Sequence, residues 1–336
     1  MKRIAVFTTN WLGDALFLFP FFAALKINFP ESHLTVISLS RINSIFGNSP
    51  HVDKAIIYHE KGKDRGFFAR LGFIAKLSRE SFDTAFIIKP SLSRTLMLKL
   101  AGIKQVIGFS DCKNSWLLTV KAPAPKGAVH KIDYFLGMLE FIGLKINQRR
   151  YEFFPSDDDK NYIRGLFQDM KIDSNLPLVV INPGANWYPK RWLPENFVEL
   201  IKRIKEKSLV NIAITGADKD KDLAAGIIRQ SGDRLINLAG KTTFGQLGAL
   251  MQEAGIIISA DSGPMHIAAA VGKKVIALFG PTSAQITGPY PPKDHIIIQK
   301  DIGCKVPCYD ANCQDYRCMK AISVEEILEK VVSFKL

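Results

Sequence analysis

The 336-residue sequence contains no apolar stretch long enough to cross a membrane. Its longest apolar run covers only residues 15–25, whereas a spanning helix needs about 20 residues. Near the start, Lys2 and Arg3 precede a short apolar run, but polar residues interrupt it before a signal peptide forms. Gly and Pro are also scarce, at 24 and 17 residues, which excludes collagen-like and low-complexity classes. We therefore expect a globular protein that stays in the cytoplasm.

Several catalytic fingerprints are absent as well. The chain has no GxGxxG dinucleotide fingerprint, no GxxxxGK[ST] phosphate loop and no HExxH zinc motif. The absence of GxGxxG argues against an enzyme that uses a nicotinamide cofactor. No Ser-His-Asp arrangement can be assigned either, so the chemistry has to come from other residues.

Cysteines are few and odd in number, which argues against a disulfide scaffold in a chain of this length. Four of the five lie near the C-terminus: Cys304, Cys308, Cys313 and Cys318. Four thiols this close can hold zinc tetrahedrally, but their spacing matches no common zinc ribbon. We favour reduced structural thiols and expect no metal.

Positive charge is abundant and unevenly placed. The net charge is +13, and residues 1–160 carry +9 of it, from 23 basic and 14 acidic residues. The first half should therefore face an anionic partner. Residues 61–79 mix six basic residues with apolar ones and resemble a segment that lies on an anionic membrane, although a crossover helix packed on its sheet explains the same pattern. A nucleic-acid-binding protein is the alternative from another class, but no recognition motif accompanies the charge, so we expect no nucleic-acid partner.

Strands and helices alternate in two blocks, which predicts an α/β fold with two parallel sheets. The alternation of strands and helices is interrupted at residues 152–159, which contain a Pro and three Asp, and it resumes at residue 177. We expect a first domain over 1–155, a linker over 156–176, a second domain over 177–322 and a terminal helix over 323–336 that returns to the first domain. Ligands of such domains favour the cleft and the carboxyl ends of the strands.

Three loops carry the chemistry that the sequence suggests. The first, residues 8–14, joins a strand to a helix and places Asp14 where a general base or an ordinary first-turn carboxylate would lie. The second, residues 182–195, combines Gly184 with Lys190 and Arg191, as an anion-binding turn or a plain surface loop would.

The third loop, residues 259–266, gives the sharpest signal. A buried strand ends, and Asp261, Ser262, Gly263 and Pro264 open a helix that includes Met265 and His266. Free N–H groups at such a helix start can bind phosphate, although a plain N-cap and a buried histidine explain the same residues. Gly280 ends the next strand at the same sheet edge. Two weaker turns, residues 216–220 and 240–243, offer Asp218 for ribose hydroxyls and the pair Thr242 and Thr243.

Taken together, these segments resemble the lipopolysaccharide heptosyltransferases, the ADP-heptose-using enzymes of glycosyltransferase family nine. The resemblance runs along nearly the whole chain and rests on the following segments: Asn10-Trp11-Leu12-Gly13-Asp14, His130-Lys131-Ile132-Asp133-Tyr134, Asn182-Pro183-Gly184 with Lys190-Arg191-Trp192, Asp261 to His266 followed by Phe279-Gly280-Pro281-Thr282, and the cysteine cluster with Pro307-Cys308.

The resemblance implies a GT-B architecture, with two Rossmann-like domains that face a central cleft. It implies inverting transfer of a heptose from ADP-heptose to the inner core of lipopolysaccharide, without a cofactor or essential metal. Asp14 becomes the general base, beside Asn10 and Gly13 in the acceptor loop. The donor is assigned to Gly184, Lys190, Asp218, Thr242, Thr243, the turn from Asp261 to His266, and Gly280.

The acceptor that the resemblance implies is Kdo-lipid A or heptosyl-Kdo-lipid A, and the Lys190-Arg191-Trp192 form is similar to that of the second heptosyltransferase. Because this acceptor is membrane-bound, we expect the protein to be peripheral to the inner membrane. A GT-B enzyme with another nucleotide-sugar donor or acceptor remains the alternative.

Overall fold

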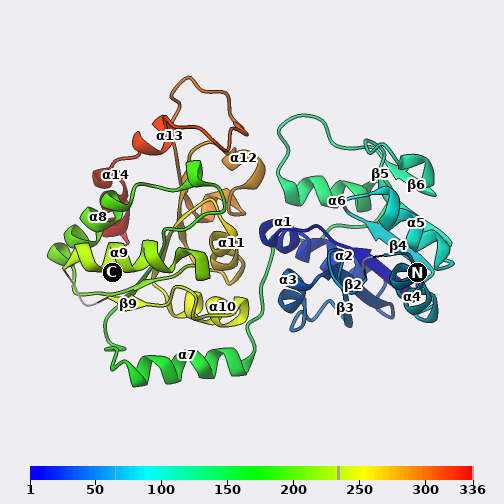
Figure 1. Ribbon diagram of the computed structural model, residues 1–336, viewed down its shortest axis with the longest axis horizontal. Helices are drawn as coiled ribbons and strands as arrows, with labels where there is room; N and C mark the ends of the chain where they lie inside the picture. The colour runs from blue at the N-terminus through cyan, green and yellow to red at the C-terminus, as the bar shows by residue number, and fades with distance from the viewer. Residues whose placement is uncertain (65, 233–234, 335–336) are drawn as a thin grey trace. The chain divides into compact units, whose positions relative to one another are not determined.

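The computed structural model describes residues 1–64, 66–232 and 235–334. The chain forms two compact units, Met1–Tyr151 and Glu152–Leu336, each built on a six-stranded sheet with helices on both faces (Figure 1). Every strand pair is parallel, so the predicted α/β class is confirmed. Among the described residues, no helix is both long and apolar enough to cross a membrane.

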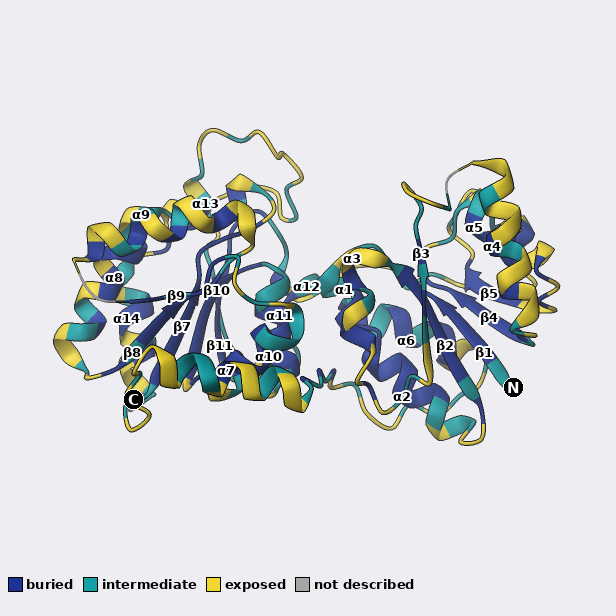
Figure 2. Cartoon of the chain, turned by 60° about the horizontal axis from the view of Figure 1, so that its bottom comes forward, coloured by how far each residue is buried: buried dark blue, intermediate teal, exposed yellow. Residues whose placement is uncertain are grey.

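The first sheet has the strand order β3-β2-β1-β4-β5-β6. Its strands are β1 (Arg3–Phe7), β2 (His33–Leu39), β3 (Lys54–Tyr58), β4 (Thr84–Ile87), β5 (Gln105–Phe109) and β6 (Val120–Ala122). Its helices are α1 (Leu12–Leu16), α2 (Phe19–Asn28), α3 (Ser40–Asn43), α4 (Phe67–Arg79), α5 (Leu92–Leu100) and α6 (Lys131–Phe141). Apart from Arg3, the residues of the central strands β1 and β4 are all buried because helices cover both faces of the sheet (Figure 2).

The second sheet has the order β12-β11-β10-β7-β8-β9. Its strands are β7 (Leu178–Asn182), β8 (Asn211–Ile214), β9 (Ile236–Asn237), β10 (Ile256–Ala260), β11 (Val275–Phe279) and β12 (Ile296–Gln299). Its helices are α7 (Asp157–Asp169), α8 (Pro194–Lys207), α9 (Lys221–Ser231), α10 (Phe244–Glu253), α11 (Gly263–Ala270), α12 (Ala284–Thr287), α13 (Arg317–Lys320) and α14 (Val324–Ser333).

Both sheets follow the Rossmann strand order, in which the chain reverses direction across the sheet between its first and fourth strands. In the first unit that switch point lies between β1 and β4, and in the second between β7 and β10. Ligands of open parallel sheets bind at the carboxyl ends of the strands beside such a point. The topology therefore directs attention to the loops after β1 and β4, and to those after β7 and β10.

The single helix expected after the first loop is divided in two. α1 ends at Leu16 and α2 begins at Phe19. Pro20 lies in the first turn of α2, where its missing N–H costs nothing because first-turn N–H groups have no partner within the helix. The same proline inside one continuous helix would remove a hydrogen bond, so the chain restarts there.

Two expected segments of the second unit, the linker and the terminal helix, are both mainly helical. The segment 156–176 is largely the helix α7, closed at its start by a capping box between Ser156 and Asp159, and this helix packs against α10. The terminal helix α14 packs against α8 and buries Ile327, Leu328 and Val331 in the second unit's core; its return to the first unit stays a prediction. The last two residues of the expected terminal segment, 335–336, lie outside the described residues.

Candidate functional site

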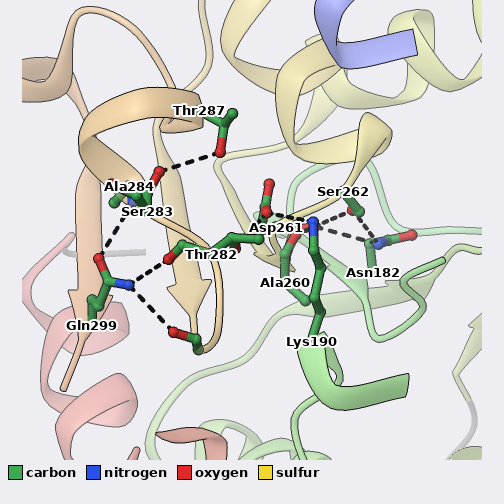
Figure 3. Close-up of polar contacts among 12 residues, drawn as sticks. Asn182, Lys190, Ala260, Asp261, Ser262, Thr282, Ser283, Ala284, Thr287 and Gln299 are labelled. Atoms are coloured by element: carbon green, nitrogen blue, oxygen red, sulfur yellow. Dashed lines mark hydrogen bonds and ion pairs between the residues drawn. The ribbon is translucent and has the colours of Figure 1, made fainter. Parts of the chain in front are cut away.

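Three loops meet at the carboxyl edge of the second sheet. They follow β7, β10 and β11, and β10 lies between the other two strands. Asn182 ends β7, Asp261 directly follows β10, and Thr282 lies just beyond β11. Figure 3 shows these side chains drawn together with Lys190 and Ser262. The site therefore lies at the switch point that the strand order indicated.

Asp261 is the centre of this cluster. One carboxylate oxygen, Oδ2, accepts a hydrogen bond from Lys190 Nζ at 2.7 Å and another from Thr282 Oγ1 at 2.6 Å. The Asp261 side chain is only 7% exposed, and Lys190 is 20% exposed. A buried carboxylate needs a partner of opposite charge, and Lys190 supplies it from a different loop. The pair leaves a cation fixed at the sheet edge.

Asn182 joins the β7 and β10 loops. Its side-chain N–H₂ donates to the carbonyl oxygen of Gly184 at 2.9 Å and to Ser262 Oγ at 3.1 Å, and its Oδ1 accepts from Thr215 Oγ1. The residue is fully buried, so these bonds satisfy a polar group that would otherwise be costly. Asn182 thereby fixes the chain on either side of the Lys190–Asp261 pair.

The N-terminus of α11 opens beside this pair. Ser262 is the N-cap, and within the described chain its side chain makes no capping hydrogen bond to the helix. Pro264 occupies the first turn, where proline is favoured. A helix start without a side-chain cap directs N–H groups and the positive end of the helix dipole outward, which is the usual arrangement for binding phosphate.

Gly184 is required for space, not for turn geometry. A Cβ at this position would lie 2.6 Å from Cγ of Asp220, a separation that atoms do not tolerate. The Asp220 carboxylate is 5% exposed and accepts from Arg191 Nη2 at 3.1 Å and from the N–H of Ala217. Arg191 in turn donates to the carbonyl oxygen of Ala185. Asp220 therefore holds the loops after β7 and β8 together, a role that the sequence analysis missed.

The weaker candidates lie along the loops after β8 and β9. Asp218 is 83% exposed and pairs with Lys221 at 2.7 Å, and a Cβ at Gly240 would meet both side chains. Thr243 is the N-cap of α10, where it forms a capping box with Gln246, while Thr242 is half-buried beside it. The structure thus brings the two weak turns together. It gives the Thr243 hydroxyl a structural role, and Asp218 stays open to a ligand.

The remaining predicted donor residues are two buried side chains of α11 and one glycine directly after β11. Met265 and His266 are buried side chains of α11, so they pack in the core and support the start of the helix. A Cβ at Gly280 would lie 2.5 Å from Met319 Sδ, which shows that this glycine admits the C-terminal segment against the end of β11. Gln299 donates to the carbonyl oxygens of Gly280 and Thr282 and fixes the same turn (Figure 3).

In the first unit, Asp14 lies in the first turn of α1, and the N-cap is Trp11. Asp14 follows the loop after β1, so it stands at the carboxyl edge beside the switch point. The neighbouring Asn10 accepts at its Oδ1 a hydrogen bond of 2.9 Å from Arg94. Arg94 is a buried residue of α5, paired with Glu60 and stacked over Phe7. This guanidinium fixes the loop that carries Asn10, Gly13 and Asp14.

The four C-terminal cysteines lie in the loop after β12 and in α13. They are free thiols, and among the described residues no group of three or more His, Cys, Asp or Glu is placed to hold an ion. Burial raises the pKa of the Cys318 thiol. The backbone N–H of Cys308 donates to the carbonyl oxygen of Pro281 at 2.6 Å, so the cysteine-rich loop is anchored beside the donor-side turn.

Comparisons with known proteins agree with this picture. Residues 70–317 match the family described as glycosyltransferase family 9 (heptosyltransferase). The chain is 27% identical to lipooligosaccharide heptosyltransferase 2 of Haemophilus influenzae, over 88% of each chain. Its fold matches a family 9 glycosyltransferase from Veillonella parvula with a TM-score of 0.92, at 20% identity, covering 99% of this chain and 97% of that one. It also matches ADP-heptose lipopolysaccharide heptosyltransferase II of Escherichia coli with a TM-score of 0.80, at 21% identity, over 99% and 98% of the two chains.

Proposed function

The chain belongs to glycosyltransferase family 9, the heptosyltransferases, and on that premise we propose that it transfers a heptose from ADP-heptose to the inner core of lipopolysaccharide. The observation that carries this proposal is the Lys190–Asp261 pair beside the uncapped start of α11. A fixed cation and a helix N-terminus together suit a diphosphate. The nucleotide-sugar donor is therefore assigned to the second unit.

The proposed reaction forms one bond and breaks one. An acceptor hydroxyl oxygen attacks the anomeric carbon of the heptose, and the bond from that carbon to the diphosphate oxygen breaks, so the electron pair leaves with ADP. Attack from the opposite side inverts the configuration. Negative charge grows on the diphosphate as the bond breaks, and Lys190 with the α11 N–H groups stabilises that charge where it develops. No resident cofactor takes part.

The proton of the acceptor hydroxyl is assigned to Asp14. A carboxylate at the edge of the first sheet accepts this proton as the new bond forms, which is the role of a general base. The Arg94–Asn10 bond keeps the preceding loop in place. Asp218, exposed beside the donor turn, is the proposed partner of the ribose hydroxyls.

The acceptor that we propose is heptosyl-Kdo-lipid A, as in a second heptosyltransferase. Support comes from the Lys190-Arg191-Trp192 sequence and from the relative in Haemophilus influenzae that is named heptosyltransferase 2. This acceptor is a phosphorylated lipid, and the first half of the chain carries the larger positive charge. We also propose that the first unit attaches peripherally to anionic membrane through residues 61–79, of which Arg65 lies outside the described residues.

A donor panel tests the proposal. Purified protein is supplied with heptosyl-Kdo-lipid A and with ADP-heptose, UDP-glucose or GDP-mannose, and the released nucleotide is measured. We expect release of ADP alone, and with inversion at the anomeric carbon of the product. Turnover with UDP-glucose and none with ADP-heptose would favour a GT-B enzyme with another donor. Kdo-lipid A as the better acceptor would contradict the assignment as a second heptosyltransferase.

A further inference from the structure

Two neighbouring helices of the first unit, α4 and α5, expose large apolar side chains. On α4 these are Phe67, Phe68 and Leu71, and on α5 they are Leu92, Leu96 and Leu100. Phe67 is 72% exposed and Phe68 84%, and their rings meet edge to face at 5.5 Å. The two helices pack against each other. We call these six residues the α4–α5 surface.

The surface is the outer face of helices whose inner faces already serve the core. Phe73 and Leu77 of α4, and Met97 and Leu98 of α5, are buried against the first sheet. The outer leucines of α5 are spaced by four residues and so lie along one side of the helix. An outer helix face is ordinarily polar, and a concentration of exposed apolar side chains marks an interaction site.

Unpaired positive charge surrounds the α4–α5 surface. Its exposed cations are Lys61, Lys63, Arg70, Lys76, Arg79 and Lys99. Within the described ranges, none of them enters an ion pair with a carboxylate. Of the nearby acidic groups, Glu60 pairs with Arg94, Glu80 pairs with Arg3 and Lys54, and Asp64 accepts a hydrogen bond from the backbone N–H of His59. Apolar side chains rimmed by free cations are the composition of a surface that binds anionic lipid.

The surface begins at the edge that carries the proposed base. α4 follows β3 and α5 follows β4, so both helices start at the carboxyl edge of the first sheet. Arg94, in the first turn of α5, bonds directly to Asn10 of the β1 loop. Phe67, Phe68 and Leu92 therefore lie at the ends of the helices nearest to the loop that leads to Asp14.

We propose that the α4–α5 surface inserts its apolar side chains into the interfacial layer of an anionic bilayer and thereby presents the Asp14 edge to the headgroups. The benefit for catalysis rests on the proposed lipid-linked acceptor, but the insertion does not. Attachment is then part electrostatic and part hydrophobic. Salt removes the first part and leaves the second, because salt screens exposed charges and strengthens apolar burial.

Vesicle binding tests the insertion. Full-length protein is mixed with vesicles of phosphatidylcholine containing phosphatidylglycerol, or of phosphatidylcholine alone. The double variant Phe67→Ser/Phe68→Ser should bind the anionic vesicles about tenfold more weakly than wild type, with unchanged circular dichroism. The matched control is Phe141→Ser, an exposed aromatic at the end of α6, and it should bind as wild type does. Phe68→Trp should show a blue-shifted emission that brominated lipid quenches, whereas Phe141→Trp should not.

Each result has a defined meaning. Equal vesicle binding by wild type and the double variant, or no quenching of Phe68→Trp, overturns the insertion and leaves the proposed transferase reaction intact. Turnover on a delipidated heptosyl-Kdo oligosaccharide should be retained by the double variant, because that acceptor needs no membrane. Its loss would place the phenylalanines in the acceptor site instead. If wild type is a dimer by analytical ultracentrifugation and the double variant a monomer, a second copy covers the surface and the membrane assignment is wrong.

Discussion

Lys190 Nζ lies 2.7 Å from Asp261 Oδ2, although the two residues are 71 positions apart in the sequence. The cation predicted for the donor phosphates is therefore held by the carboxylate of the sharpest sequence motif. Thr282 binds the same carboxylate oxygen from a third loop. Three loops thus share one buried anchor, and a change at any of them should affect the donor more than the fold.

Replacement of Lys190 by Ala should lower kcat by about 10²-fold or raise the donor KM. The reason is that the leaving diphosphate loses a cation that stabilises it more in the transition state than in the ground state. The change also leaves the buried Asp261 without its ion pair, so Tm should fall. Steady-state kinetics with varied ADP-heptose measures the effect, and Lys207→Ala, an exposed lysine at the end of α8, is the control. Unchanged donor kinetics would mean that Lys190 is a structural cation only.

Asp14→Asn should reduce turnover by about 10²–10⁴-fold, the range for loss of a general base, and should leave ADP binding unchanged. The amide keeps the size of the side chain at the start of α1 but cannot accept the proton of the acceptor hydroxyl. Isothermal titration with ADP and a turnover assay separate the two quantities. A variant with more than roughly a third of the wild-type kcat would remove Asp14 from the role of base.

Gly184→Ala should cost about 1–3 kcal/mol of stability, the range for overpacking, because the new Cβ would fall 2.6 Å from Cγ of Asp220. Since that contact lies between the loops after β7 and β8, ADP binding should weaken too. The matched control is Gly165→Ala in α7, where no atom lies within 4 Å of the new Cβ. That change should stabilise the protein by about 0.5–1 kcal/mol. Equal denaturation midpoints for the two variants would contradict the close-approach argument.

Asp83 should stabilise the protein at neutral pH and lose this effect in acid. Burial acts to raise its pKa, but hydrogen bonds from the N–H groups of Arg3 and Lys2, at 2.9 and 2.6 Å, outweigh burial, so the pKa is lowered overall. A carboxyl whose pKa is lower in the folded protein stabilises it above the unfolded pKa, which is about 3.9, and loses that stabilisation as pH falls through the folded pKa.

The corresponding variant, Asp83→Asn, should unfold about 1 kcal/mol more easily at pH 7, and the difference should shrink as pH falls below about 4. Urea denaturation at several pH values measures this, with Asp169→Asn, an exposed carboxylate at the end of α7, as the control. A difference that stays constant down to pH 2 would show that the ionised form of Asp83 contributes nothing.

Membrane attachment should fall steeply as salt rises, because exposed charges supply part of it and each basic residue near an anionic surface contributes about 1 kcal/mol. Co-sedimentation with anionic liposomes should fall again when Lys61, Lys63, Arg65 and Arg70 are replaced by Ser. The control replaces four exposed lysines of the second unit: Lys202, Lys207, Lys293 and Lys305. Equal binding to neutral and anionic liposomes would show that the basic residues of the segment 61–79 do not contribute to attachment.

The sequence predicted the candidate site best where the residues of the site are contiguous in the chain. Residues 259–266 contain a strand end, an N-cap and the helix start in eight positions, so local rules apply, and the structure forms β10 and α11 there. The Lys190–Asp261 pair is different, because it depends on β7 and β10 lying side by side. The sequence placed both residues near the donor but contained no sign that they bind each other.

The features that the sequence did not reveal depend on long-range neighbours. Asp220 matters because Gly184 and Gly216 both approach its side chain from separate loops, and nothing within residues 216–220 shows this. The edge strands β6 and β9 are three and two residues long, too short for a periodic pattern, and they form only because a partner strand supplies hydrogen bonds. The break at Pro20, by contrast, had a local signal that could have been used.

Mass spectrometry of the lipopolysaccharide core tests the central claim most directly. A strain that lacks this chain is complemented with wild type or with Asp14→Asn, expressed at equal levels, and the core oligosaccharide is weighed. We expect a core truncated after the first heptose in the deletion strain, full restoration by wild type, and no restoration by Asp14→Asn. A deletion strain whose core keeps every heptose would contradict the assignment of this protein as a lipopolysaccharide heptosyltransferase.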